Sequence, residues 1–477
     1  MRNPKLTLCA LASVLALSAC SFAPTYETPA APLPAAYPQA SAAAPVALAV
    51  PQWESFVQSP ALRDLVQQAL THNRDLRQTL IDVEAVRAQY RIQRADRLPN
   101  LNLQGSGSRQ RIPADVSQTQ AATVQSSYEV GVGLVAFELD LFGRVRNLSQ
   151  AALQQYLATE SAAQATRITL VGEVMRTWLL RNSAHQRYQL AQQTLQSREA
   201  GFQLIGERHR NGVASALDLQ DARGLAAQAR AEQEATDREF RQASNALALL
   251  VGANDASSLP APEPYGTQVL AGTVTPGLPA ELLTRRPDIR AAEHRLQARN
   301  ADIGAARAAF FPRISLTGAL GTSSAELSGL FGSGSHAWSF MPQISLPIFD
   351  GGRNTANLDL ATLRRDGAVV AYEQAVQSAF RETADALAAT ETLDREQAAR
   401  LELAQSSTEG LRLSELRYRQ GVDSHLRYLD AQRRNFADRT SLIEVTTERQ
   451  LAASTLFKAL GGGWQAAANT DAALAPR

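Results

Sequence analysis

The sequence contains few cysteines, few aromatic residues and no excess of charge of either sign. Only Cys9 and Cys20 occur among 477 residues. Because Cys9 lies in a segment that we expect to be removed, no intramolecular disulfide is possible in the mature chain. The 47 Lys and Arg residues balance 46 Asp and Glu residues, which argues against a nucleic-acid partner. An aromatic content of 6% favours extended helices over a bulky core.

The N-terminus has the pattern of a secretory signal peptide. Arg2 and Lys5 precede an apolar run over residues 6–17 that is too short for a transmembrane helix. The run ends in Leu-Ser-Ala-Cys, which resembles a lipobox, so we expect Cys20 to become the acylated first residue of the mature chain. Ser21 follows, and lipoproteins without an aspartate at this position usually go to the outer membrane. The alternative is an ordinary signal peptide with a chance cysteine.

Proline is absent from two long runs, one between Pro113 and Pro260 and one between Pro347 and Pro476. Runs of this kind that are rich in Ala, Gln, Leu and Arg indicate helices. In the first run, mostly apolar residues recur at steps of three, four or seven, which is typical of a coiled-coil seam. These residues are Leu170, Val174, Trp178, His185, Tyr188, Leu195, Phe202 and Ile205.

The long helix of the first run should begin near Gly143 and end at Arg210. At about 1.5 Å per residue, its length would be about 100 Å. Gly212, after Asn211, provides a left-handed turn at the end of this helix, and a second helix should return towards Leu250. Gln420-Gly421 predicts an equivalent turn in the second run.

Much of the sequence occurs twice. Residues 208–223 align without a gap with residues 417–432, and two further pairs of similar stretches recur in the same order. Internal duplication predicts two similar units packed about a pseudo-twofold axis. We therefore divide the chain into a signal peptide (1–19), an acylated tether (20–52), a first repeat (53–251), a linker (252–279), a second repeat (280–462) and a tail (463–477).

Upstream of each long helix, apolar residues alternate with polar ones, which indicates β-strands. Four strands of about ten residues are expected, in two hairpins with polar loops at 110–127 and 322–336. The alternating residues are Leu101, Leu103 and Gly105; Tyr128, Val130, Val132 and Leu134; Ile314, Leu316, Gly318 and Leu320; and Trp338, Phe340, Ile344, Leu346 and Ile348. This pattern is typical of transmembrane strands. Because four strands cannot close a barrel, several chains would have to share one.

Several motifs, in chain order, resemble those of one known family. They are the lipobox, AYPQ at 36–39, AQYRIQRAD at 88–96, FELDLFGR at 137–144, LLTRRPDIRAAEHRL at 282–296, GAARAAFFPRISLTG at 304–318 and ALGGGW at 459–464. Together they resemble the outer-membrane channel lipoproteins of tripartite, RND-type multidrug efflux systems, the OprM and OprJ group of the TolC superfamily. The resemblance covers nearly the whole mature chain.

This resemblance implies a TolC-like homotrimer of mixed α and β structure. Each protomer would contribute four strands to a twelve-stranded transmembrane β-barrel, continued into the periplasm by a long α-helical coiled-coil tunnel. Such channels are not enzymes and hold no metal or cofactor. They pass drugs and other toxic compounds from an inner-membrane RND pump and a periplasmic adaptor to the outside. The mature chain would lie in the outer membrane, anchored by the lipid on Cys20.

The resemblance also assigns roles at the two predicted turns. The helical tips that meet the adaptor would be Gly212, Val213, Gly421 and Val422. A periplasmic gate, in which polar groups tie neighbouring helices together and a leucine constricts the aperture, would consist of Tyr418, Leu426, Asp430 and Arg433. Without the resemblance, the charges in this stretch would be interpreted as solvated salt bridges.

Two other interpretations are weighed against the drug-efflux channel. A structural or adaptor-type periplasmic coiled-coil lipoprotein would share the signal, the acyl anchor and the long helices, although it would not need strands of membrane length. Within the channel class, metal-ion efflux and protein secretion compete with drug efflux.

A glycine pattern at residues 131–136 superficially matches a dinucleotide-binding fingerprint. No helix is expected to open at Gly131, as that fingerprint requires. We therefore interpret these glycines as a strand packed closely on its neighbours.

Overall fold

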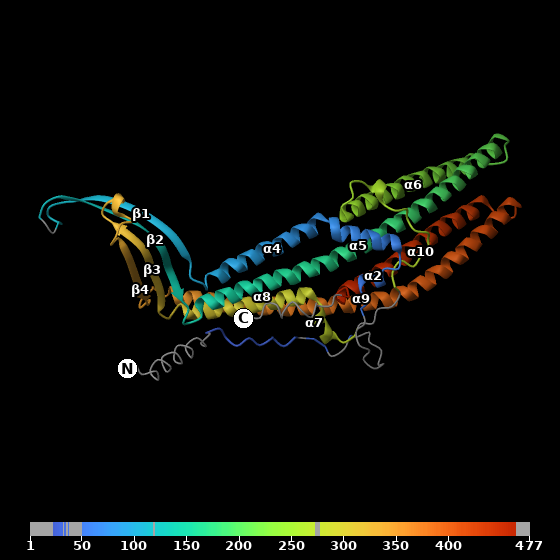
Figure 1. The fold of residues 1–477 in the computed structure, drawn as a ribbon. Helices are drawn as coiled ribbons and strands as arrows, with labels where there is room; N and C mark the ends of the chain where they lie inside the picture. Colours follow the sequence, from blue (N-terminus) through green and yellow to red (C-terminus); the bar gives the residue numbers. More distant parts are fainter. Residues whose placement is uncertain are drawn as a thin grey trace. The chain divides into compact units, whose positions relative to one another are not determined.

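The computed structural model of the chain describes residues 22–31, 33–34, 37, 50–117, 120–271 and 277–463. Cys20, the predicted lipidation site, lies outside these residues. In chain order the elements (Figure 1) are α2 (Trp53–Phe56), α3 (Pro60–His72), α4 (Arg74–Ala95), β1 (Leu101–Ile112), β2 (Thr123–Leu139), α5 (Arg144–Arg210), α6 (Ala216–Val251), η1 (Ala256–Ser258), η2 (Pro279–Glu281), α7 (Leu282–Arg285), α8 (Pro287–Ala308), β3 (Arg313–Ser324), η3 (Leu327–Gly329), β4 (His336–Ser345), α9 (Arg353–Arg419) and α10 (His425–Ala459).

The described chain forms two compact units, and each unit draws on both halves of the sequence. The first includes residues 82–160 and 291–373, and the second includes residues 161–290 and 374–463. Within the described residues, no helix combines the length and the apolar character needed to cross a membrane.

The first unit contains a four-stranded antiparallel sheet in the order β1-β2-β3-β4 (Figure 1). Directly opposite residues in such a sheet point to the same face. One row across all four strands is apolar and exposed: Leu103, Val132, Leu320 and Trp338. The adjacent row, on the other face, is Gln104, Gly131, Gly321 and Ala337. The sheet therefore has one apolar face and one face of polar and small residues.

Two of these glycines allow β2 and β3 to approach each other closely. Gly131 and Gly321 are directly opposite, and a Cβ added to Gly321 would lie 2.1 Å from the carbonyl oxygen of Val130. The prediction that Gly131 reflects close strand packing is confirmed.

The first hairpin is longer than its alternation pattern indicates. The predicted loop over 110–127 is wrong at both ends, because β1 extends to Ile112 and β2 begins at Thr123. In this region the ladder pairs residues such as Arg111 and Val124. Strand pairing is a property of backbone groups, so it continues past the point where apolar side chains stop alternating.

The predicted long helices are confirmed as α5 and α9, each of 67 residues. In the first repeat, α5 begins at Arg144 and ends at Arg210, and α6 returns to Val251, as expected. Most of the length of α5 and α9 lies in the second unit, where each is followed by an antiparallel partner helix.

The core of the second unit lies near the ends of α6 and α10 that are remote from the two turns. Phe56 of α2 stacks on Phe457 of α10 with ring centroids 4.4 Å apart, and Leu247 of α6 is fully buried in the same cluster. Trp178, a predicted seam residue, is also fully buried there. Burying each such side chain contributes about 1.5 to 3 kcal/mol. This core therefore holds the base of the helical hairpins together.

Arg286, inside the motif LLTRRPDIRAAEHRL, is bonded to residues of three helices. It is 7% exposed and donates to Asp288 at 2.7 Å, to Glu382 at 2.9 Å and to the carbonyl oxygen of Ala459 at 2.9 Å. Burial would raise the pKa of Asp288, but the hydrogen bond and the charge of Arg286, together with backbone N–H groups, outweigh it and the pKa is lowered. The motif thus fixes the start of α8 against α9 and the end of α10.

Candidate functional site

The two predicted turns lie between α5 and α6 and between α9 and α10, at the ends of the hairpins. Gly212 has a φ of 74° and Gly421 a φ of 72°, so both adopt the left-handed conformation that favours glycine. The N–H of Val213 donates to the carbonyl oxygen of Arg208 at 2.8 Å. In the second turn, the N–H of Val422 donates to the carbonyl oxygen of Arg417 at 2.9 Å. These bonds close the last turn of each helix in the same way, which confirms the predicted helix ends.

Apolar side chains are exposed at both turns. Val213, Val422 and Leu426 are each more than half exposed. A Cβ added to Gly212 or Gly421 would contact nothing within 4 Å. In this single chain the predicted tip residues therefore form open surface.

Tyr418 connects the two hairpins. Arg208 at the end of α5 donates from Nη1 to Oη of Tyr418 on α9 at 3.1 Å, and its guanidinium lies 5.8 Å from the centre of the tyrosine ring. Tyr418 also stacks on Tyr428 of α10, with ring centroids 5.4 Å apart. Burial raises the pKa of Tyr428. Tyr418 is thus held between one helix of the first repeat and one helix of the second.

Asp430 and Arg433, the other polar residues of the predicted gate, pair along a single helix. Nη1 of Arg433 donates to Oδ1 of Asp430 at 3.1 Å, and both side chains are about half exposed. Beside the turns, Arg208 and Tyr418 make a hydrogen bond between helices of different repeats. The predicted gate role of Asp430 and Arg433 stays a prediction.

The sequence-based prediction missed an ion pair beside the second turn. Arg417 donates from Nε and Nη2 to the carboxylate of Asp423, at 2.8 and 3.1 Å, and these bonds lower the pKa of Asp423. In the alignment of the two repeats, Asp423 stands opposite Ala214. This difference between the repeats could have indicated the ion pair, because only the second turn has a carboxylate at this position.

His425 lies at the start of α10 among groups from both repeats. Its Nδ1 is 4.0 Å from Oδ1 of Asp218 on α6, and its ring lies 5.2 Å from that of Tyr418. Burial lowers the pKa of His425, although the nearby Asp218 and Asp221 act in the opposite direction. The neutral imidazole is therefore the form that this environment favours.

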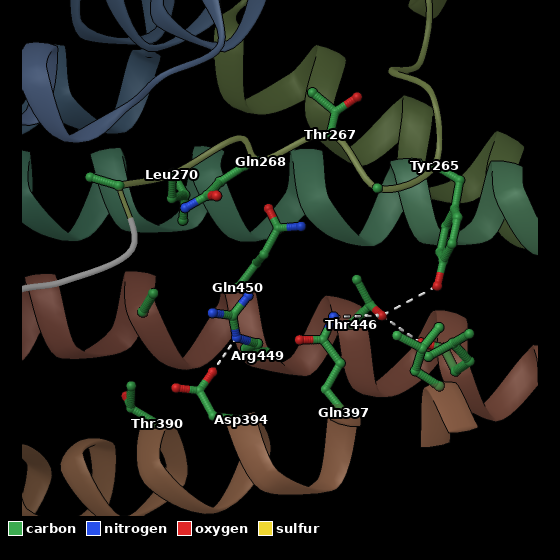
Figure 2. Close-up of a pocket in the computed structure, with 15 residues that line it drawn as sticks. Tyr265, Thr267, Gln268, Leu270, Thr390, Asp394, Gln397, Thr446, Arg449 and Gln450 are labelled. Atoms are coloured by element: carbon green, nitrogen blue, oxygen red, sulfur yellow. Dashed lines mark hydrogen bonds and ion pairs between the residues drawn. The ribbon is translucent and has the colours of Figure 1, made fainter. Parts of the chain in front are cut away.

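A cavity of about 270 Å³, lined by both polar and apolar residues, lies further from the turns, between the segment 265–271 and helices α9 and α10. Figure 2 shows Tyr265, Gln397 and Thr446 pointing toward one another. Nε2 of Gln397 donates to Oγ1 of Thr446 at 3.2 Å. Both Arg449 of α10 and Asp394 of α9 line the cavity, and Nε of Arg449 donates to Oδ1 of Asp394. These polar groups bond to one another, which fits a structural contact between the linker and the two helices.

Among the described residues, no group of three or more His, Cys, Asp or Glu side chains could hold a metal ion.

The chain is similar to known efflux proteins along nearly its whole length. The family model described as Outer membrane efflux protein matches residues 65–253 and 278–462. Outer membrane protein OprJ of Pseudomonas aeruginosa is 57% identical, over 97% of each chain. Toluene efflux pump outer membrane protein TtgI of Pseudomonas putida is 46% identical, over 96% of this chain and 98% of the relative.

The chain is also similar in structure to solved proteins. A membrane protein from Pseudomonas aeruginosa, 57% identical, superimposes with a TM-score of 0.89 over 93% of this chain and 98% of its own. The open state of the Neisseria gonorrhoeae MtrE outer membrane channel, 40% identical, superimposes with a TM-score of 0.85 over the same shares. The resemblance to the OprM and OprJ group is therefore confirmed. The chain belongs to the outer membrane efflux protein family and is the TolC-like outer-membrane exit channel of a tripartite efflux pump.

Proposed function

We propose that three copies of this chain form one barrel and one tunnel, through which small toxic organic compounds leave the cell passively. The observation that carries the proposal is the two-faced sheet, with Leu103, Val132, Leu320 and Trp338 exposed in one row. Such a row suits contact with lipid, and the small and polar opposite face suits a water-filled lumen. Strands β1 and β4 are the edges of the sheet. Because open edges are not tolerated in a membrane, pairing β1 of one copy with β4 of the next would satisfy both.

The helical turns are the proposed contact with the periplasmic adaptor. Val213 and Val422 expose apolar side chains beside Gly212 and Gly421. Exposed apolar residues at a rigid turn suit a protein partner, because docking would remove their surface from water. An inner-membrane RND pump would supply the energy, and the channel itself would carry out no chemical step and need no cofactor.

Acylation of Cys20 is the proposed lipid anchor. Phe22, two residues further on, stacks on Phe311 with ring centroids 4.5 Å apart, and Nδ2 of Asn300 donates to the carbonyl oxygen of Pro24 at 2.8 Å. These contacts hold the segment that follows Cys20 against the unit that contains the sheet. An acyl chain attached there would enter the membrane that the strands occupy.

The gate is proposed at the turn region, where Arg208 and Tyr418 join two helices and Leu426 is exposed. Asp430 and Arg433 would complete it in the trimer. Each bond is weak on its own, which suits a gate, since adaptor docking must supply the difference in free energy that opens it.

The proposed transport role is tested by deleting the gene from a host strain that lacks other efflux channels. Because one relative is named for a toluene efflux pump, toluene and antibiotics are suitable challenges. Deletion should increase susceptibility and the accumulation of a fluorescent dye, and the wild-type gene should restore both. Unchanged susceptibility and accumulation, with pump and adaptor present, would argue against the function.

A further inference from the structure

A cavity of about 280 Å³ lies between α5, α6 and α10, near the predicted gate residues. Two arginines line it, Arg198 of α5 and Arg433 of α10. Much of the remaining wall is apolar and consists of Ala191, Leu225, Ala229, Phe436 and Ala437. The cavity thus combines a concentrated positive charge with a hydrophobic wall.

Arg198 is buried without a compensating carboxylate. It is 8% exposed in the single chain, and its Nη1 is inaccessible and has no hydrogen-bond partner among the described residues. Burial, together with the nearby charge of Arg433, lowers the pKa of Arg198. Leaving a guanidinium in this state is unfavourable, so an anion placed beside it would be strongly stabilised.

The acidic groups nearest to the cavity do not neutralise Arg198. Glu232 lines the cavity, but its side chain is exposed and makes no ion pair with Arg198 in the described structure. Asp430 accepts from Nη1 of Arg433. Because a guanidinium has five N–H donors, Arg433 retains further donors for a second acceptor. The two arginines can therefore share one external anion.

We propose that this cavity binds a small organic carboxylate, with its carboxylate between Arg198 and Arg433 and its apolar body against Leu225 and Phe436. A planar carboxylate can accept paired bonds from guanidinium groups. Inorganic phosphate carries more charge and would lose hydration against the apolar wall without replacement. The bound ligand would connect α5 of the first repeat to α10 of the second, which is a regulatory contact that the proposed transport function does not require.

Fluorine NMR with para-fluorobenzoate as the probe tests the proposal on the full-length protein in detergent. The protein should broaden the probe signal, and neutral para-fluorobenzamide should be broadened much less. Arg198→Met and Arg433→Met should each weaken probe binding by about tenfold or more, since each removes charge-assisted hydrogen bonds. Phe436→Ala, which keeps both arginines, should also weaken it. Arg395→Met removes an exposed arginine that pairs with Glu391 elsewhere on α9, and it should leave binding unchanged.

The alternatives give different results. No broadening with the wild-type protein would overturn the proposal and would indicate that a side chain, such as Glu232 or one from a second copy, fills the site. Equal broadening of the probe signal by the wild-type protein, Arg198→Met and Arg433→Met would indicate partition into the detergent, and would also overturn it. Displacement of the probe by inorganic phosphate at equal concentration would contradict the carboxylate assignment. If Arg198→Met fails to assemble, Arg433→Met and Phe436→Ala decide, because residue 433 is half exposed.

Discussion

Arg208 and Tyr418 are hydrogen-bonded at 3.1 Å, and they come from different positions of the two repeats. In the repeat alignment, Arg208 corresponds to Arg417, whereas Tyr418 corresponds to His209. The duplication therefore does not produce two equivalent ties. Arg208 bonds across the hairpins, and its counterpart Arg417 bonds to Asp423 within its own hairpin.

Tyr418→Phe should loosen the turn region without unfolding it. The substitution removes the hydroxyl that accepts from Arg208 and keeps the ring that stacks on Tyr428. Loss of one such bond costs about 0.5 to 1.5 kcal/mol, so protection of nearby amides from hydrogen exchange should fall by about two- to tenfold. Tyr265→Phe is the control, because Tyr265 contacts Thr446 far from the turns. Equal protection in both variants would show that the bond is not formed in solution.

The sequence predicts the helical turns well because few residues can serve there. A left-handed residue after a helix is usually glycine, and this identifies Gly212 and Gly421. It does not predict the bond between Arg208 and Tyr418, which are 210 positions apart. Alignment of the repeats shows where their sequences differ, but not which side chains meet across them.

The sequence also does not predict which charged side chains are buried. Arg198 lies in a helix with many polar residues, and nothing in its spacing distinguishes a buried guanidinium from a solvated one. Arg286 belongs to a recognisable motif, yet two of its partners, Glu382 and the carbonyl oxygen of Ala459, lie on helices distant in sequence. Such contacts depend on tertiary packing, which local periodicity does not specify.

Gly321→Ala should prevent correct pairing of β2 and β3. The added Cβ would lie 2.1 Å from the carbonyl oxygen of Val130, so the backbone would have to move, at a cost of about 1 to 3 kcal/mol or more. We expect loss of the heat-modifiable, SDS-resistant form on gels. Gly105→Ala in β1 is the matched control, because its Cβ would meet Val130 at an ordinary 3.6 Å. Normal assembly of the Gly321 variant would contradict the close approach.

Arg286→Met should lower the thermal unfolding midpoint. It removes two ion pairs, leaving Asp288 and Glu382 unpaired, although both are about 40% exposed and can be partly rehydrated. We expect a loss of about 2 to 3 kcal/mol, below the usual cost of breaking a fully buried pair. Arg381→Met removes an exposed pair with Asp385 and should change stability by no more than about 0.5 kcal/mol.

The pH dependence of the Arg286 contact has a definite sign. Because the folded pKa of Asp288 is lowered, its contribution is complete above the ordinary carboxyl pKa and is lost as the pH falls through the folded pKa. At pH values below about 4, the thermal unfolding midpoint of the wild type should therefore decrease more steeply with falling pH than that of Arg286→Met. Parallel curves would contradict the role of Asp288.

Protonation of His425 at low pH should favour an open arrangement of the turn region. Its pKa is lowered in the folded state, first by burial, so the closed arrangement is most stable when the imidazole is neutral and weakens as the pH falls below about 6.5. Conductance in planar bilayers should rise between pH 7.5 and pH 5.5 in the wild type and change less in His425→Gln. The Asp218 carboxyl, whose pKa Ser215 lowers, titrates below this window. An equal response in both proteins would assign the effect to another group.

The central claim is that the chain forms a channel held closed near its helical turns, and single-channel conductance tests it most directly. Asp430→Ala combined with Arg433→Ala removes a half-exposed pair worth about 0 to 1 kcal/mol, so the fold should persist while the balance of closed and open states shifts by up to about fivefold. Glu409→Ala combined with Arg412→Ala removes an exposed pair of the same spacing on α9 and serves as control. Conductance should be higher for the first double variant only. Unchanged conductance in a correctly trimeric Asp430/Arg433 variant, or an equal rise in the control, would contradict it.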